Sequence, residues 1–348
     1  MCMGSEEYEF TSQFNDKYNI VTRRMLRALS ENSRASISDL SGVVKMSRRS
    51  TRSKLDRIEK EFGIHYTAEL NENLLGLASR HVIAVKFDKK PDYGRIKELL
   101  QKSYIPQLAV SARGSFDLII YAVSVSAKEY AHWDKSMQIL LSEYGADWKP
   151  SEIVHAHLGF VPLRTELIDR LALPTDHKSI LKILNADSRA TFSKISKDLG
   201  MHFNTVAYNF NKMLKSGYIN RFTITMDKPK DLGIASFFAN FRPRDGFEKA
   251  SVIARRMIMG DDQNTLVSRT LISMPIIGSY GLFVMGIFDD YKTAYNKYIL
   301  AYKKIYAAHG IRMDCGEVTG VLLGNLPIRS VDNKKEYHTI VWDPERLG

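Results

Sequence analysis

Basic side chains and serines alternate along one short stretch of the sequence, between residues 47 and 57. Arginine guanidinium groups bind guanine edges and phosphates through paired hydrogen bonds, and small hydroxyls bond phosphate oxygens without steric conflict. A single acid, Asp56, opposes five cations here. The stretch therefore indicates a surface for a polyanion, and its members are Ser47, Arg48, Arg49, Ser50, Arg52, Ser53, Lys54 and Arg57.

The apolar residues of the same stretch predict a helix that presents this surface. Thr51, Leu55 and Ile58 recur at i, i+4 and i+7, which places them on a buried face and leaves the cations on the opposite face. Ser47 is a suitable N-cap, and Gly63 is a suitable stop. Cations near a helix N-terminus oppose the helix dipole, so a helix selected for stability alone would avoid them. This argues against a merely solvated basic face.

Shorter elements around the basic helix predict a winged helix-turn-helix. We expect helices at 18–29 and 36–43 before it and an extended wing at 64–70 after it. In such a module the third helix enters the major groove of DNA, with its N-terminal residues at the base edges. The basic residues of this helix are therefore candidate DNA contacts.

The module occurs twice in the chain. Residues 33–40 return at 188–195, 155 positions later, and the residue classes stay aligned through the third helix. A repeat this long indicates duplication of a whole unit and a pseudo-dimer on one chain. The second third helix has fewer cations, so it binds DNA more weakly, reads a different half-site, or serves as a pairing surface. Its candidate DNA contacts are His202, Asn204, Thr205, Tyr208, Asn209 and Lys212.

Segments in the order β-α-β-β-α-β follow each winged helix. This order predicts a ferredoxin-like sandwich, in which two helices cover one face of a four-stranded antiparallel sheet. The other face is apolar, and we expect it to pair with the sheet of the other copy or of another chain. Strands are predicted at 81–87, 108–112, 117–125, 153–158, 236–241, 265–273, 282–288 and 317–323, and helices at 93–101, 127–144, 247–259 and 291–308.

A glycine turn lies between the middle strands of each copy, at residues 113–117 and 277–281. Together with the order of domains, this turn resembles the Lrp/AsnC family of transcription regulators, in a tandem form that covers residues 17–324. The resemblance implies operator binding by the winged helix, dimerisation through the sheet domain, and an amino acid or other small effector near the turn. The effector-binding residues that it implies are Gly114, Ser115, Asp117 and Gly278.

The two turns differ in ways that limit what the resemblance implies. Gly281 replaces Asp117, and Ile277 replaces Arg113, so a site that needs the carboxylate would be missing from the second copy. A glycine at such a position also allows the backbone conformation that a tight hairpin turn requires. Ligand binding and hairpin geometry both remain open as reasons for these glycines.

The composition fits a folded protein with an anionic partner. The 348 residues include 50 Lys and Arg against 39 Asp and Glu, a net charge of +11. The only cysteines, Cys2 and Cys315, provide neither a disulfide framework nor a metal cluster. The sequence has no membrane-spanning apolar run, and residues 1–10 lack the apolar region of a signal peptide. We expect a soluble, cytoplasmic protein with no metal, no cofactor and no membrane partner.

An enzymatic alternative exists because siroheme decarboxylases resemble the same two-domain architecture and use the sheet domain to hold a tetrapyrrole. The nearest candidates for that chemistry are His155 and His157, with Arg113 close by. Histidines are sparse elsewhere, and the sequence has no phosphate loop and no Cys-x-x-Cys motif, so we predict no catalytic residue and no enzymatic activity. A second alternative is an architectural protein that coats DNA without reading its sequence.

These observations predict an α+β protein in which two winged helix-turn-helix domains alternate with two ferredoxin-like βαββαβ domains. The predicted function is sequence-specific regulation of transcription, with double-stranded DNA as partner, modulation by a small effector, and a homodimer or higher oligomer formed through the sheet domains. The expected boundaries are an N-terminal tail 1–16, winged helix 17–73, sheet domain 74–160, linker 161–173, winged helix 174–230, sheet domain 231–324 and C-terminal tail 325–348.

Overall fold

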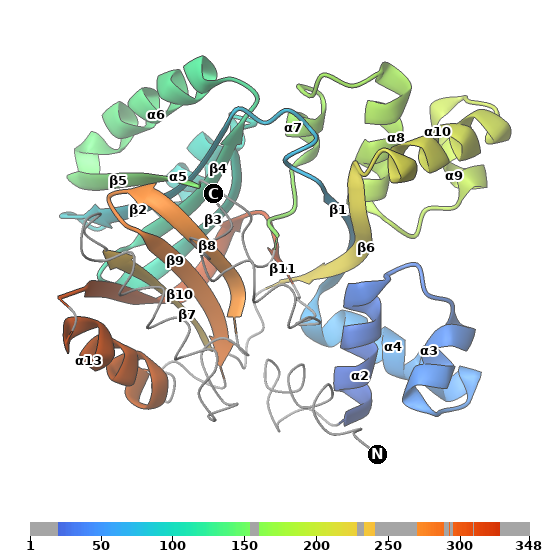
Figure 1. The fold of residues 1–348 in the computed structure, drawn as a ribbon, viewed down its shortest axis with the longest axis horizontal. Coiled ribbons are helices and arrows are strands. Elements are labelled where there is room, and N and C mark those ends of the chain that lie inside the picture. Colours follow the sequence, from blue (N-terminus) through green and yellow to red (C-terminus); the bar gives the residue numbers. More distant parts are fainter. Residues whose placement is uncertain are drawn as a thin grey trace, which may run out of the picture.

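The computed structural model describes residues 20–153, 160–227, 233–240, 270–288, 292, 295–308 and 310–327. One lobe of the molecule holds helices around a small sheet, and the other holds a strand barrel with further helices on its outside, as Figure 1 shows. The tail at 1–16, the helix predicted at 247–259 and most of the tail at 325–348 lie outside the described residues.

The first helical unit forms as its sequence predicts, with helices α2 (Ile20–Glu31), α3 (Ile37–Val44) and α4 (Arg48–Phe62). The Ser47 side chain caps α4 by accepting from the backbone N–H of Ser50, and Gly63 ends the helix with φ 56°. Leu55 and Ile58 of α4 are fully buried against α2 and α3. The predicted cap, stop and buried stripe of the basic helix are thus present.

The second helical unit repeats this order with helices α8 (Thr175–Ala186), α9 (Phe192–Leu199) and α10 (Phe203–Lys215). The strands that follow the two units, β1 (Ile64–Leu70) and β6 (Ile219–Met226), pair with each other in antiparallel fashion. A short strand, β11 (Leu326–Pro327), pairs with the other edge of β6. Each predicted wing therefore finds its partner in the other unit.

The two units also exchange contacts around this strand pair. Thr67 of β1 donates a side-chain hydrogen bond of 2.8 Å to the carbonyl oxygen of Asn185 at the end of α8. Its neighbour across the pair, Thr223 of β6, donates one of 2.7 Å to the carbonyl oxygen of Ser30 in α2. Because α2 rests on β6 and α8 rests on β1, neither unit buries its first helix without the other.

The repeated Ser-Arg-Ala segments meet at the centre of this interface. The Oγ atoms of Ser33 and Ser188 lie 2.6 Å apart, and both residues are fully buried. Arg189 donates from Nε to the carbonyl oxygen of Ser33 at 2.6 Å, and Arg34 donates in return to the carbonyl oxygen of Ser188. The guanidinium of Arg189 also lies 3.9 Å from the ring centre of Tyr66. The residues that reveal the repeat in the sequence therefore hold the two units together.

Eight strands form a closed barrel in the other lobe, in the order β10-β3-β4-β2-β5-β8-β9-β7. Four come from each half of the chain, and the halves join where β5 pairs with β8 and β10 pairs with β3. The apolar sheet faces therefore cover each other within one chain. The strands are β2 (Ser79–Phe87), β3 (Pro106–Gly114), β4 (Leu118–Ser124), β5 (Ala146–Ile153), β7 (Gly233–Asn240), β8 (Thr270–Gly278), β9 (Leu282–Phe288) and β10 (Arg312–Leu323).

Two strands are shifted from their predicted positions, and one of them is β8, which was predicted at 265–273 and is observed at Thr270–Gly278. The strand predicted at 153–158 runs instead from Ala146 to Ile153, as β5, and residues 154–159 lie outside the described part of the chain. Its first five residues, including Asp147 and Lys149, are partly or fully exposed. The strand is held by backbone pairing with β2 on one side and β8 on the other, so it lacks the apolar pattern that marks the other strands.

Helices pack on the outside of the barrel. In the first half, α5 (Tyr93–Gln101) and α6 (Ala127–Leu141) bury Ile96, Leu100 and Met137 against the sheet. A 3₁₀ turn (Ser142–Tyr144) extends α6. In the second half, a π-helical turn (Tyr295–Ile299) leads into α13 (Leu300–Ala308). A short helix, α7 (Thr165–Ile168), connects the first barrel half to α8.

Candidate nucleic-acid interface

The basic face of α4 is exposed at its N-terminal half, where a groove-binding helix makes its contacts. Within the described part of the chain, the guanidinium groups of Arg49 and Arg52 take part in no ion pair or hydrogen bond, whereas Arg48 donates to Ser38 of α3 at 2.9 Å. Lys54 is only partly exposed. The exposed members of the predicted surface are Ser47, Arg48, Arg49, Ser50, Arg52, Ser53 and Arg57.

The corresponding face of α10 carries a different set of side chains. Tyr208 is 66% exposed and Phe203 is 48% exposed, which is unusual for large rings on a helix surface. Phe203 was not among the predicted contacts, and the signal for it was its place directly after the N-cap position His202. The exposed residues that the sequence did single out are His202, Asn204, Thr205, Tyr208 and Lys212.

Asn209 is a correction to that prediction. Its side chain is buried, with 9% of the residue exposed, so it does not belong to the outer face of α10. The cause is helical spacing, because Asn209 follows Val206 by three positions and precedes Met213 by four, and both of these belong to the buried stripe.

The two glycine turns lie where the barrel halves join. Gly114 and Gly278 both have φ 142°, a region that disfavours other residues. A Cβ atom at Gly114 would stand 2.6 Å from the carbonyl oxygen of Cys315 on β10, and one at Gly278 would stand 2.9 Å from that of Pro150 on β5. The close approach of a strand from the other half therefore requires glycine at both turns.

The polar groups of the first turn are engaged within the protein. The Asp117 carboxylate accepts from the backbone N–H of Phe87 at 2.9 Å and from Lys86 Nζ at 2.9 Å. The N–H of Ser115 donates to the carbonyl oxygen of Cys315 at 2.9 Å, and its Oγ accepts from the N–H of Cys315. These contacts give the residues of the turn a structural role within the barrel. Effector binding by Gly114, Ser115, Asp117 and Gly278 stays a prediction.

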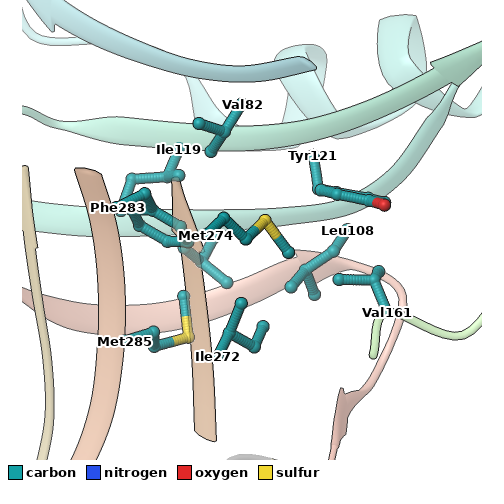
Figure 2. Close-up of a pocket in the computed structure, with 10 residues that line it drawn as sticks. Val82, Leu108, Ile119, Tyr121, Val161, Ile272, Met274, Phe283 and Met285 are labelled. Atoms are coloured by element: carbon teal, nitrogen blue, oxygen red, sulfur yellow. The ribbon is translucent and has the colours of Figure 1, made fainter. Parts of the chain in front are cut away.

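The barrel interior is filled by apolar side chains. Figure 2 shows the residues around its cavity, including Val82, Met274 and Phe283 from strands of both halves. The cavity has a volume of about 10 Å³, which is about the space that one water molecule needs. No organic ligand fits there, because pockets for such ligands measure roughly 300–1,000 Å³. A more open cleft of about 440 Å³ lies outside the barrel, lined by Lys97, Gln101, Asp227 and residues 321–324.

A buried carboxylate links the first helical unit to the barrel. Glu72 follows β1, and its two oxygens lie 3.0 and 2.9 Å from the donating hydroxyl of Tyr121 on β4. Arg80 of β2 approaches the same carboxylate at 3.6 Å. Burial raises the pKa of Glu72 to about 7, against the opposing effects of Tyr121 and Arg80. Sequence pattern alone does not mark this site, since a lone acid in a connecting loop is ordinarily solvated.

A second polar cluster that the sequence did not single out lies between α6 and the barrel. The ring of His81 stacks on that of Tyr130, with centres 3.7 Å apart. Asp134 accepts from Trp148 Nε1 at 2.8 Å and from the Tyr130 hydroxyl at 3.3 Å. Burial lowers the pKa of His81, although nearby carboxylates oppose the shift. The lowered pKa favours the neutral form of this histidine, which is part of a packed aromatic layer.

The structure describes only part of the set weighed for enzymatic chemistry. His155 and His157 lie outside the described residues. Arg113 is largely exposed and forms an ion pair of 2.7 Å with Glu317 across the β3–β10 joint. In the described ranges, no three His, Cys, Asp or Glu side chains are grouped to hold a metal ion, and no helix is long and apolar enough to cross a membrane.

A family model described as winged helix-turn-helix DNA-binding matches residues 177–220. These residues run from α8 through α10 to the start of β6, so the match covers the second helical unit, which has a winged helix-turn-helix fold. Comparison with curated protein sequences finds no match.

Solved structures match over much more of the chain. The siroheme decarboxylase NirDL in complex with an iron-uroporphyrin III analogue is 12% identical, with a TM-score of 0.52, and the match covers 94% of this chain and all of that one. A second structure of NirDL is 13% identical, with a TM-score of 0.53 over 92% of this chain and 99% of that one. At these identities the matches establish a shared fold.

The prediction that the protein is not an enzyme is contradicted by this finding, because the fold that spans nearly the whole chain is that of an enzyme. A transcriptional regulator from Neisseria meningitidis, in complex with L-Met, is 20% identical over 46% of this chain and 98% of its own. The TM-score of this match is 0.36. The comparisons thus give a winged helix-turn-helix match for the second helical unit, within a fold that nearly the whole chain shares with NirDL.

Proposed function

We propose that the protein is a DNA-binding transcription regulator of Lrp/AsnC type, with two tandem copies of a winged helix and a ferredoxin-like sheet domain. The observation that carries the proposal is the row of exposed arginines at the N-terminal half of α4, in which Arg49 and Arg52 form no ion pair within the described residues. A helix that presents cations against its own dipole is best explained by a polyanionic partner. The match of residues 177–220 to a DNA-binding family supports the same partner for the second unit.

The tandem arrangement is supported by the reciprocal contacts between the units. The Ser33–Ser188 hydrogen bond and the pairing of β1 with β6 have the form of a two-fold interface, but between parts of one chain. A single chain then presents two reading helices as a dimer of single-copy regulators would. Because the two reading faces differ, the DNA site is expected to be asymmetric.

The proposal includes partners beyond DNA. The small effector is proposed to bind near the glycine turns, and the open cleft of about 440 Å³, where Lys97 and Asp227 offer opposite charges, is an alternative place for it. Assembly through the barrel needs a surface other than a sheet edge, because the described strands of the barrel form a closed ring. The outer face of α6 has exposed apolar side chains for this purpose, with Ile139 63% and Leu140 41% exposed.

A second candidate function is decarboxylation of a siroheme-like tetrapyrrole. The match to NirDL over 94% of the chain favours it, although at 12% identity this is an argument from fold. The tetrapyrrole substrate would have to bind outside the barrel, because the interior cavity measures about 10 Å³. The two functions are separable, since one predicts retention of DNA and the other predicts binding of a coloured ligand.

The test is capture of genomic DNA fragments by the purified full-length protein, with excess unrelated DNA as competitor and an absorbance scan before and after adding siroheme. Retention of a few fragments by a protein whose spectrum siroheme leaves unchanged supports a sequence-specific regulator. Release of every fragment by the competitor supports an architectural role instead. A shifted siroheme band without DNA retention moves the decarboxylase to first place.

A further inference from the structure

The two reading helices can be compared position by position. Both begin one residue after an N-cap position, Ser47 in α4 and His202 in α10. Their buried stripes also coincide at the 155-residue offset, with Leu55 matching Phe210 and Ile58 matching Met213. Because the buried faces superimpose in sequence, each exposed position of α4 has a defined counterpart on α10.

The differences are concentrated at the N-terminal half, where reading helices touch bases. Arg48 corresponds to Phe203, and Arg49 corresponds to Asn204. Ser53 corresponds to Tyr208, the most exposed ring of the helix at 66%. Arg52 corresponds to Ala207. Every arginine of the first half of α4 is therefore replaced by an amide, a ring or a methyl group.

The cations at the other end of the two helices match each other. Arg57 corresponds to Lys212, and Lys60 corresponds to Lys215, and all four residues are exposed. Cations that flank a groove-bound helix bind phosphates, which fixes the position of the helix and is indifferent to sequence. The phosphate-binding end is thus common to both helices, while the base-reading end differs.

We propose that the two helices read half-sites of different base composition, a G·C-rich half by α4 and an A·T-rich half by α10. Arginine pairs with the O6 and N7 acceptors of guanine, whereas asparagine pairs with N6 and N7 of adenine, and apolar groups contact the thymine methyl. Arg49 and Arg52 suit the first half-site. Asn204 suits adenine, while Phe203 and Tyr208 suit thymine methyls. This inference rests on the proposed DNA-binding function and specifies its substrate.

Exposed rings also suit a protein-binding surface, but the polar groups beside the rings favour DNA for α10. Phe203 packs edge-on against Phe192 of α9, with ring centres 6.0 Å apart, so it is held in place at the helix N-terminus. Around the rings stand Asn204, Thr205 and Lys212, groups that bond bases and phosphates. A protein-docking role for α10 is one outcome of the test.

The test is selection of binding sites from a randomised DNA duplex by the full-length protein, at fixed salt and with unrelated competitor DNA. We expect an asymmetric site with one G·C-rich and one A·T-rich half. A symmetric site, or a single half-site beside random sequence, overturns the inference and leaves DNA binding intact; in the second case α10 serves another partner. Failure to retain any DNA overturns the proposed function as well.

Variants then assign each half-site to a helix. Arg49→Ala should reduce the preference for the selected bases over other bases by about tenfold or more in the G·C-rich half alone. Asn204→Ala should reduce the corresponding preference by the same factor in the A·T-rich half alone. Asn211→Ala, an exposed asparagine of α10 two turns further along, is the control for the amide and should leave both preferences unchanged. Arg57→Ala should weaken binding to all DNA sequences by the same factor. A loss in the opposite half from either variant contradicts the assignment.

Discussion

Arg49 and Arg52 are the side chains on which DNA binding is expected to depend most. Both are exposed, so Arg49→Ala and Arg52→Ala should leave the fold unchanged and weaken DNA binding by about 1–3 kcal/mol each, because each removes a bidentate contact to a base. Equilibrium titration of a retained fragment measures the loss. Arg95→Ala removes an equal charge from α5, where its partner is Glu143, and serves as the control. If both α4 variants bound the fragment as tightly as the parent protein, α4 would not be part of the DNA interface.

Glu72 makes the stability of the protein depend on pH. Burial raises its pKa in the folded state to about 7, whereas a solvated glutamate has a value near 4.5. The protonated form is therefore favoured by folding, so its stabilising contribution is fully present below pH 4.5 and is lost as the pH rises through 7. Urea unfolding of Glu72→Gln, which keeps a neutral acceptor for Tyr121, should show a weaker fall in stability over this range. An identical pH profile for both proteins would mean that Glu72 does not titrate there.

At the scale of the element, α4 has one face for folding and another for binding. Leu55 is fully buried, so Leu55→Ala should destabilise the protein by about 2–5 kcal/mol through the cavity that it leaves. Thermal unfolding measures this loss, and the melting temperature should fall before the preference for a DNA sequence changes. Asp56→Ala, next to it on the exposed face, should stay within about 0.5 kcal/mol of the parent. Equal stability losses in the two variants would contradict the assignment of the faces.

The interface between the two helical units depends on a shared buried hydrogen bond. Ser188→Ala leaves the hydroxyl of Ser33 buried without this partner, which costs about 1–3 kcal/mol, and Ser33→Ala has the mirror effect. The double variant removes both hydroxyls, so its loss should be smaller than the sum of the two single losses. Urea unfolding of the four proteins gives the coupling. Strict additivity would show that the two serines do not interact.

At the scale of the whole molecule, local sequence patterns predicted individual helices and strands but did not predict which strands pair with each other. The helix 93–101 and the strand 282–288 have the predicted bounds, because apolar spacing and flanking turns are local properties. The pairing of β5 with β8, and of β10 with β3, joins strands far apart in the sequence and leaves no local pattern. The burial of Glu72 depends on neighbours brought by the fold, Tyr121 and Arg80, whereas the burial of Asn209 follows from helical spacing that the sequence already contains. The same limit applies to enzymatic activity. Local motifs predicted none, whereas nearly the whole chain shares its fold with a siroheme decarboxylase.

The measurement that tests DNA reading most directly is the ratio of two affinities of the full-length protein at one salt concentration. One duplex is a retained genomic fragment, and the other contains the same bases in scrambled order. A sequence-specific regulator should prefer the first by about 10³-fold or more. Equal affinities for the two duplexes would contradict the reading of base sequence by α4 and α10 and would leave only attraction between their cations and the phosphates.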